Sequence, residues 1–310
     1  MSLNFACLLL PSHKSQWTAA DALDQPGVCP GNCDHPELYT LDASPYESLH
    51  VTYHTILRGK GVPLKEQGNP KPVQHPEYDS IYLGFSRNGF DISRPPGDQP
   101  ADAPGFQLRA GRRRPFASMS PRQQSGVTTA NDSWNFGGVQ STTGSPVLAP
   151  DNKTLLFYFG GQQGFSHSCV GPGSQTGVAQ LRRDGFAAME TGDSAGVVTT
   201  APVSGAKAEL FVNFAGTLSV DVLDAATLQS LLGPSELLSG DSTFAQVVWP
   251  KQEGPLEPFV GKALRLRFTL GGATRLFAFW TAADACGASY GFVGAGGPGA
   301  PDGVDSNGRC

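Results

Sequence analysis

Apolar and charged side chains alternate with a period of two in the segment ALRLRFTL, residues 263–270. Leu264, Leu266 and Phe268 would face one side of a strand, and the two intervening arginines would face the other. This pattern is typical of an antiparallel strand with one buried face. Short runs of this kind recur along the chain, and glycine and proline, about a fifth of the 310 residues, interrupt them. The sequence therefore predicts an all-β protein without long helices.

The first two thirds of the chain contain two groups of strand-like segments. Residues 36–95 hold ELYTL, ESLHVTYHTIL and YLGFS, and residues 128–189 hold NFGGVQS, SPVLAP, LLFYFGG and GVAQLRR. A loop rich in Gly, Pro and Arg, about 91–127, separates the groups. A repeated antiparallel unit with a surface loop between its copies is typical of a β-propeller. We expect residues 1–194 to form a partial propeller of two to three blades.

The remaining residues, 195–310, contain six strand-like runs at a spacing of roughly ten residues. They predict a β-sandwich, and only the segment 225–233 could form a helical turn or two. The C-terminal tail is too rich in glycine to pack as a regular element, although Cys310 could tether it. The runs are GVVTTAPV, AELFVNFAG, TLSVDVLD, FAQVVWP, ALRLRFTL and TRLFAFWTA.

Each of the two strand groups ends on a similar turn, Arg-Asn-Gly-Phe at 87–90 and Arg-Asp-Gly-Phe at 183–186. Asn and Asp side chains both accept hydrogen bonds from backbone N–H groups in tight turns, and we expect Gly89 and Gly185 to adopt positive φ. A catalytic carboxylate could not be replaced by the amide of Asn88. The repeat is therefore interpreted as structural.

Six segments, in this order and spacing, resemble the five-bladed-propeller glycoside hydrolases of the family 32-like group. The resemblance covers nearly the whole chain from residue 36 onward. It rests on the segments HPELYTLDASPYESLHV, YLGFSRNGFDISRP, LLFYFGG, TGVAQLRRDGF, KAELFVNFAG and FAFWTAADACGASYGFVGAGGPG.

Membership of this family would imply cleavage of a glycosidic bond by two carboxyl groups. The resemblance places the aspartate nucleophile in the first blade and an Arg-Asp-Pro segment in the second, but neither motif occurs here. It leaves Glu37, in PELYTL, as the candidate general acid. The chain would then begin near the end of the second blade. Such an open ring would expose unpaired sheet edges and would need its missing N-terminal blades or another chain to complete it.

Six further residues are candidates for binding a carbohydrate, because sugars present apolar C–H faces and hydroxyl edges. Three of them have an alternative role. The glutamate beside the tyrosine could be a strand-edge residue, the tryptophan could pack in the core, and the arginine could pair with an acid, as could Arg182 beside the second turn. The six are Tyr46, Glu47, Arg87, Trp134, Gln140 and His167.

Other classes of site have little support in the sequence. His50 and His54 fall on one face of a strand, but no carboxylate is placed to complete a metal site, and a hydrogen-bonded histidine is the alternative. Cys29 and Cys33 lack the further ligands that zinc needs, so a local disulfide is expected. The glycine run 294–299 is not followed by a helix that could bind phosphate. We expect no metal and no cofactor.

A net charge of −5 gives no electrostatic basis for nucleic-acid binding, and the arginines at 112–114 are expected to be solvated. No apolar run reaches eighteen residues, so no membrane span is expected. Two glycosylation sequons, at Asn131 and Asn152, favour an extracellular protein.

Two functions follow. The first is a carbohydrate-active, glycoside hydrolase-like protein that lacks the blades carrying its nucleophile. The second is a non-catalytic extracellular module that binds carbohydrate or serves a structural role. The fold alone cannot choose between them, because function depends on the site.

Overall fold

The computed structural model describes residues 37–58, 78–94, 115–117, 134–135, 138–142, 144–162, 174–250, 252–298, 300–306 and 308–310. Within these ranges every regular element is a strand, except for one 3-10 turn, η4, at Glu257–Phe259. The predicted all-β class is therefore confirmed. The chain divides into two compact units, the first made of residues 1–145 and 157–179 and the second of residues 146–156 and 180–310.

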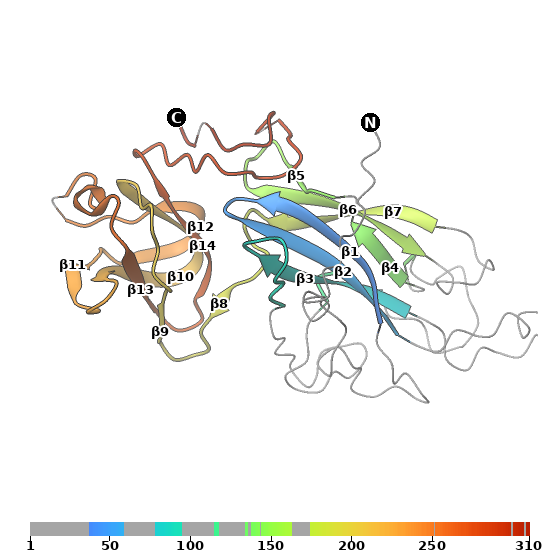
Figure 1. The fold of residues 1–310 in the computed structure, drawn as a ribbon, viewed down its shortest axis with the longest axis horizontal. Coiled ribbons are helices and arrows are strands. Elements are labelled where there is room, and N and C mark those ends of the chain that lie inside the picture. The colour runs from blue at the N-terminus through green and yellow to red at the C-terminus, as the bar shows by residue number, and fades with distance from the viewer. Residues whose placement is uncertain are drawn as a thin grey trace, which may run out of the picture. The chain divides into compact units, whose positions relative to one another are not determined.

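The first group of predicted strands forms a three-stranded antiparallel sheet, drawn in blue and cyan in Figure 1. β-branched and aromatic residues dominate its central strand, as expected for a strand buried by neighbours on both edges. Glu47, at φ 50°, belongs to the tight turn between the first two strands. The strands are β1 (Glu37–Tyr46), β2 (Leu49–Arg58) and β3 (Tyr78–Ser86).

The second group of predicted strands also forms one antiparallel sheet. The first two of its strands follow each other along one edge of the third, and the fourth also pairs with the third. Both predicted groups are thus confirmed as sheets, while their identity as propeller blades stays a prediction. The strands are β4 (Gly138–Thr142), β5 (Val147–Leu148), β6 (Thr154–Gln162) and β7 (Ser174–Arg182).

Aromatic rings form the interior of the first unit. Along β6, Phe157 and Phe159 are buried while Tyr158 between them is exposed, as the period of two requires. The ring of Phe157 meets those of Tyr53 and Phe116 edge-on, with centroids 5.7 and 5.2 Å apart, and the rings of Tyr53 and Phe116 are tilted to each other at 6.0 Å. These contacts pack the inner face of the three-stranded sheet against β6.

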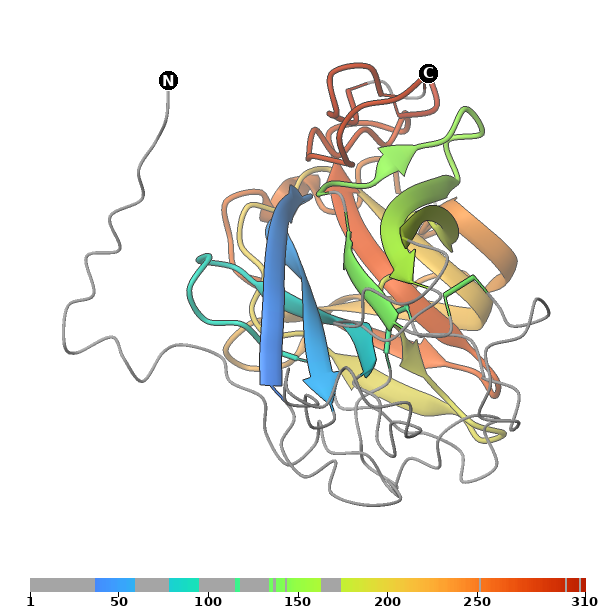
Figure 2. The same ribbon diagram turned by 90° about the vertical axis from the view of Figure 1, so that its right-hand side faces the viewer.

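The C-terminal strands form one seven-stranded sheet that curls into a half-barrel. Figures 1 and 2 show its long strands as curved yellow-to-orange ribbons. The domain boundary expected at 194/195 falls between two strands of this sheet. Its members are β8 (Met189–Glu190), β9 (Gly196–Thr199), β10 (Glu209–Asp224), β11 (Ser230–Pro234), β12 (Leu238–Gln246), β13 (Leu264–Leu270) and β14 (Arg275–Ala282).

The register explains the curl. Strands β12 and β11 follow one edge of β10, and β14 and β13 follow the other. The pairing shows this, since Phe211 pairs with both β12 and β14, and Leu218 pairs with both β12 and β13. Strands β8 and β9 continue the series beyond β14 and β13. The seven strands thus act as four long ribbons: β10 is continuous, and each of the other three consists of two shorter strands. The two runs predicted separately at 208–216 and 217–224 are one strand bent in the middle.

The bend runs through glycine and threonine residues on neighbouring ribbons. Gly216 has φ +117° and pairs with Gly240, at φ +124°, conformations that L-residues with side chains rarely adopt. A Cβ on Gly216 would lie 2.8 Å from the Cα of Thr274. The buried Thr274 hydroxyl in turn accepts a hydrogen bond from Thr217 N at 3.0 Å and donates to Thr217 O at 3.1 Å. The bend is therefore closely packed and specific in sequence.

The concave side of the curled sheet holds the main core of the second unit. Residues 209–214 of β10 are all buried, alternate residues of β13 are buried, and the predicted separation of Leu264, Leu266 and Phe268 from Arg265 and Arg267 is confirmed. The segment 225–233, where a helical turn was considered, instead forms a turn followed by β11. The core cluster consists of Ala206, Leu210, Val212, Phe214, Leu218, Val220, Val222, Val247, Trp249, Leu256, Leu264, Leu266, Phe268, Leu270 and Leu276.

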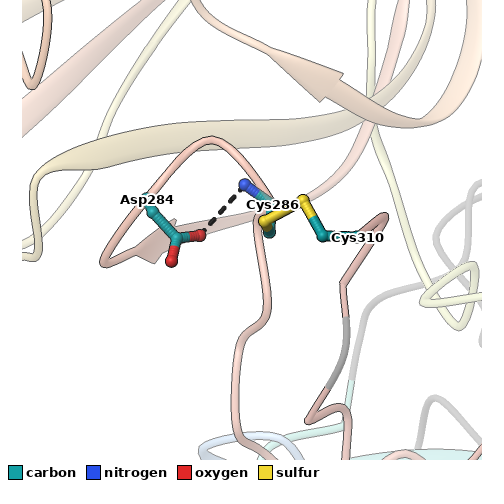
Figure 3. Close-up of a disulfide and its surroundings, with 3 residues drawn as sticks. All are labelled: Asp284, Cys286 and Cys310. Carbon is teal, nitrogen blue, oxygen red and sulfur yellow. Dashed lines mark hydrogen bonds between the residues drawn. A yellow bond between two sulfur atoms is a disulfide. The ribbon is translucent and has the colours of Figure 1, made fainter.

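A disulfide closes the C-terminal tail. Cys286 bonds to Cys310, so the tether anticipated for Cys310 is present (Figure 3). Asp284 Oδ1 accepts a hydrogen bond of 3.0 Å from Cys286 N and fixes the turn before the disulfide. The predicted pair Cys29 and Cys33 lies outside the described residues. Among the described residues, no helix is long and apolar enough to cross a membrane.

Candidate functional site

The predicted site residues separate into two groups at opposite ends of the three-stranded sheet. Glu37 begins β1 and Tyr46 ends it, nine residues apart, which corresponds to about 30 Å along a strand. Gln140, on β4, belongs to the Glu37 end. Its neighbour Val139 donates a 2.8 Å hydrogen bond to Asp79 on β3. Asp79 and Glu37 both pair with the same residue of β2, so they lie level with each other across the sheet. The side chain of Glu37 lies outside the described part of the structure, as does the whole of His167.

At the other end, the structure brings Tyr46, Glu47 and Arg87 together. Tyr46 is buried at 3% exposure, Glu47 lies in the β1–β2 turn, and Arg87 Nη1 donates to Ser48 Oγ at 3.5 Å. A sugar ring could not stack on a buried tyrosine. This end of the sheet therefore has polar groups but no exposed aromatic partner among these three residues.

Trp134 packs against the second sheet. Its indole lies 5.6 Å from the ring of Phe159 and over the glycines of two adjacent strands. A Cβ on Gly161 would lie 2.7 Å from Trp134 Cη2, and one on Gly177 would lie 2.6 Å from Cζ2. Only glycine leaves room for the ring at these two positions. The structure thus supports the core-packing alternative for Trp134.

Asp42 is the carboxyl group of the first sheet with a perturbed environment. It lies directly opposite Tyr53, and burial raises the pKa of Asp42. Burial also raises the pKa of Tyr53, partly offset by a hydrogen bond with Ser44. The buried Asp79 lies four rows away, about 13 Å along the strand. This exceeds the 5–9.5 Å between the two carboxyl groups of typical glycosidases, so these two aspartates do not form a catalytic pair.

His50 and His54 lie on the same face of β2, as the period of two predicted. His54 is 1% exposed and stacks on Tyr82, with ring centroids 6.0 Å apart and planes at 25°. Among the described residues, no group of three or more His, Cys, Asp or Glu side chains could hold a metal ion. His54 is thus a packed residue of the sheet.

The repeated turns are structural, but their geometry differs. In the first copy, Asn88 Oδ1 accepts hydrogen bonds of 2.9 Å from the backbone N–H groups of Phe90 and Asp91, and Gly89 has φ +79°. In the second copy, the left-handed residue is Asp184, at φ 58°, and not Gly185 as expected. Asp tolerates this conformation better than most residues, so the second turn can place its positive φ one position earlier in the motif.

The second turn is anchored to β10 by Arg182. Its Nε donates to Asn213 Oδ1 at 2.6 Å, Nη2 donates to Phe214 O at 3.1 Å, and Nη1 pairs with Asp241. The guanidinium also lies 4.9 Å from the centroid of the Phe277 ring. The predicted pairing role of Arg182 is therefore confirmed, although its partners lie on the curled sheet.

Arg183 anchors the tail from inside the second unit. Its Nη2 donates to Asp305 Oδ2 at 2.9 Å, and both side chains are about 93% buried, at 7% and 6% exposure. The same oxygen of Asp305 accepts hydrogen bonds from the backbone N–H and the hydroxyl of Ser289, both at 3.3 Å. Asp305 also exchanges backbone hydrogen bonds of 3.0 Å with Tyr290 and Gly291. The buried ion pair thus positions the backbone at 289–291.

Two aromatic side chains project from this anchored segment. Tyr290 is 60% exposed and Phe292 is 50% exposed, and Phe292 bridges to Val304 across the tail. Tyr290 has φ 61°, which is a rare and strained conformation for an aromatic residue. Lys207 Nζ lies 5.2 Å from the centroid of the Tyr290 ring and donates to Ser289 O at 3.2 Å. We call Lys207, Tyr290 and Phe292 the aromatic platform.

Sequence reasoning did not select these residues. The glycine-rich tail gives no strand periodicity, and nothing local indicates that Arg183, about 110 residues earlier, anchors it. The only sequence feature that indicated an ordered tail was Cys310, which could tether it through a disulfide. Comparison with models of protein families, with curated proteins and with solved structures finds no match to this chain. The functional argument therefore rests on the chemistry of the described residues.

Proposed function

We propose that this chain is a non-catalytic, extracellular carbohydrate-binding module whose all-β units support the aromatic platform. The observation that carries the proposal is Tyr290, a strained and exposed aromatic residue on a segment anchored by a buried ion pair. Aromatic rings suit saccharides because sugar C–H faces stack on them while hydroxyl groups find polar neighbours.

The strain at Tyr290 supports a binding role. A left-handed aromatic residue costs about 1–3 kcal/mol, and such a residue persists where its surroundings overdetermine its conformation. Here the backbone of Asp305 and the ammonium group of Lys207 hold Tyr290 in place. A ring presented rigidly loses little conformational entropy when a ligand binds. The disulfide of the same tail agrees with an oxidising, extracellular setting.

The competing hypothesis is the family 32-like hydrolase with a partial propeller, a C-terminal β-sandwich and Glu37 as its acid. Of the predicted residues that the structure describes, Gln140 alone lies at the Glu37 end of the first sheet. Tyr46, Glu47 and Arg87 lie at the far end of β1, and Trp134 packs on glycines. These placements favour binding over catalysis.

The test is a glycan array followed by titration calorimetry with the full chain. Replacing Tyr290 or Phe292 with Ala should weaken binding of any captured saccharide roughly tenfold, since an aromatic contact contributes about 0.5–1.5 kcal/mol beyond its buried area. The control is Phe90→Ala, which removes a ring that is 73% exposed in the first turn and should leave affinity unchanged.

The same preparations should be assayed for release of fructose or other sugars. Hydrolysis that Glu37→Gln abolishes would establish the enzyme hypothesis. Equal affinity of all three Ala variants would refute the aromatic platform as the binding site, and the absence of any captured glycan would refute the proposed function.

A further inference from the structure

Two cations accompany the aromatic platform, and each lies over an aromatic ring. Lys207 lies over Tyr290, and the Arg309 guanidinium lies 4.3 Å from the centroid of the Phe244 ring. In the part of the chain that the structure describes, neither forms an ion pair with a carboxylate. We propose that the saccharide bound here is anionic, with a carboxylate or sulfate group held by Lys207 and Arg309. This inference rests on the proposed carbohydrate-binding function.

Both cations are attached to the same short segment. Lys207 Nζ donates to Ser289 O at 3.2 Å, and the backbone N of Arg309 donates to Cys286 O at 2.8 Å. The two carbonyl groups belong to residues three positions apart, so they lie at most about 10 Å apart. The disulfide of Cys286 fixes the position of the residue next to Arg309. A saccharide of two or three rings on Tyr290 would therefore span the distance between the two points at which Lys207 and Arg309 are held.

The buried acidic residue beside the segment is already paired. Asp305 is buried and paired with Arg183, so its charge is compensated. Asp284 accepts the hydrogen bond from Cys286 N in the turn that precedes the disulfide (Figure 3). The chain as a whole carries a net charge of −5, which would repel an anionic ligand from most of the surface. Lys207 beside the exposed Tyr290 ring and Arg309 over the buried Phe244 ring, neither of them ion-paired within the described residues, are therefore a local feature.

The donors that remain suit an anion. An ammonium group has three N–H donors, and Lys207 uses one of them on Ser289 O. The guanidinium of Arg309 is exposed and can present a planar pair of donors to a carboxylate or sulfate group. Hydrogen bonds to charged groups are roughly twice as strong as those between neutral groups, so these two residues would select a charged sugar over a neutral one.

The experiment compares three probes by calorimetry with the full chain: a galacturonate trisaccharide, its neutral methyl ester and a sulfated galactose trisaccharide. We expect an anionic probe to bind at least tenfold more tightly than the ester, because one charge-assisted hydrogen bond is worth about 1.5–3 kcal/mol. The dissociation constant should rise with added NaCl. The carboxylated and the sulfated probes distinguish the two possible anionic groups.

Variants locate the effect. Lys207→Met and Arg309→Gln should each remove most of the preference for the anionic probe, whereas Lys207→Arg should preserve it. The matched control is Lys262→Met, since Lys262 also lies over a ring, 5.8 Å from the centroid of Phe259, on the 3-10 turn. Unfolding midpoints of all variants establish that they are folded.

Equal binding of the ester and both anionic probes would overturn this inference and leave the proposed carbohydrate-binding function standing. So would an anionic preference that survives both substitutions. Failure of every saccharide to bind would overturn the inference and the proposed function together.

Discussion

The buried ion pair between Arg183 and Asp305 should contribute most to holding the tail on the second unit. Both side chains are almost fully buried, and their atoms lie 2.9 Å apart. Asp305→Asn would remove the closer of the two carboxylates beside the buried Arg183 cation, since Asp184 lies at 4.0 Å. Breaking one partner of a buried pair costs about 3–5 kcal/mol. We expect the free energy of unfolding to fall by this amount.

The chain offers a matched control in an exposed pair. Arg275 and Glu190 lie 3.5 Å apart, with side chains 56% and 63% exposed. Glu190→Gln should change the free energy of unfolding by less than about 1 kcal/mol, since solvent screens such a pair and long side chains resist ordering. The contrast between the two variants isolates the effect of burial from that of charge.

The assay is urea unfolding followed by tryptophan fluorescence. Trp249, which is 2% exposed in the core of the second unit, should report the loss of that core. In 1 M NaCl the Debye length is about 3 Å, so the small effect of Glu190→Gln should vanish while that of Asp305→Asn persists. A double variant, Arg183→Met with Asp305→Leu, should be more stable than Asp305→Asn alone, because it removes both charges of the 2.9 Å pair.

The reasoning would be refuted if Asp305→Asn destabilised the protein by no more than Glu190→Gln. It would also be refuted if the double variant lost as much stability as the sum of its single substitutions. Either result would mean that the pair is not coupled in the way its burial and geometry require.

Three further predictions concern the bend, the disulfide and the first sheet. Gly216→Ala should lower the free energy of unfolding by more than about 2 kcal/mol. The control is Gly205→Ala, which should cost about 1 kcal/mol, because Gly205 also has a positive φ, +75°, but no atom lies within 4 Å of the added Cβ. Urea titration measures both changes. The double substitution Cys286→Ser with Cys310→Ser opens a loop with a sequence separation of 24 and should cost about 3.5 kcal/mol by the chain-entropy relation, as urea titration under oxidising conditions would measure. Burial raises the pKa of Asp42 above its unfolded value of 3.8, so the folded state binds more protons, and the free energy of unfolding falls as pH rises from about 4 through the folded pKa. Asp42→Asn should remove this fall and raise the unfolding midpoint at pH 7. An unchanged dependence of stability on pH in the variant would contradict the prediction.

Local sequence was sufficient to predict most strands. Alternation in ESLHVTYHTIL, LLFYFGG and ALRLRFTL identified β2, β6 and β13, since the period of two arises from the geometry of each strand alone. The two groups of strands predicted in the first two thirds of the chain also form sheets, and their strands were identified from the same period of two. The helical turn considered for the segment 225–233 was not found, because the pairing of β11 with β10 outweighs the local preference for a helix.

The candidate site depended on contacts between residues far apart in the chain. Asp184, and not Gly185, adopts the positive φ of the second turn, where Arg182 and Arg183, the two residues just before it, are held by Asn213 and Asp305. Tyr290 could not be selected from a glycine-rich tail, since its strain and exposure follow from Asp305 and Lys207. The predicted carbohydrate residues, Glu37 among them, stay predictions.

The sequence by itself determined the all-β class, the positions of most strands and the tether at Cys310. These depend on interactions within a strand or on the chemistry of one residue type. The tertiary structure alone decided that seven strands would act as four ribbons bent at Gly216 and Thr274, and that Arg183 would hold the tail through Asp305. The physical reason is that register, bending and buried charge pairing are properties of residues brought together by folding, and no window along the chain contains both partners.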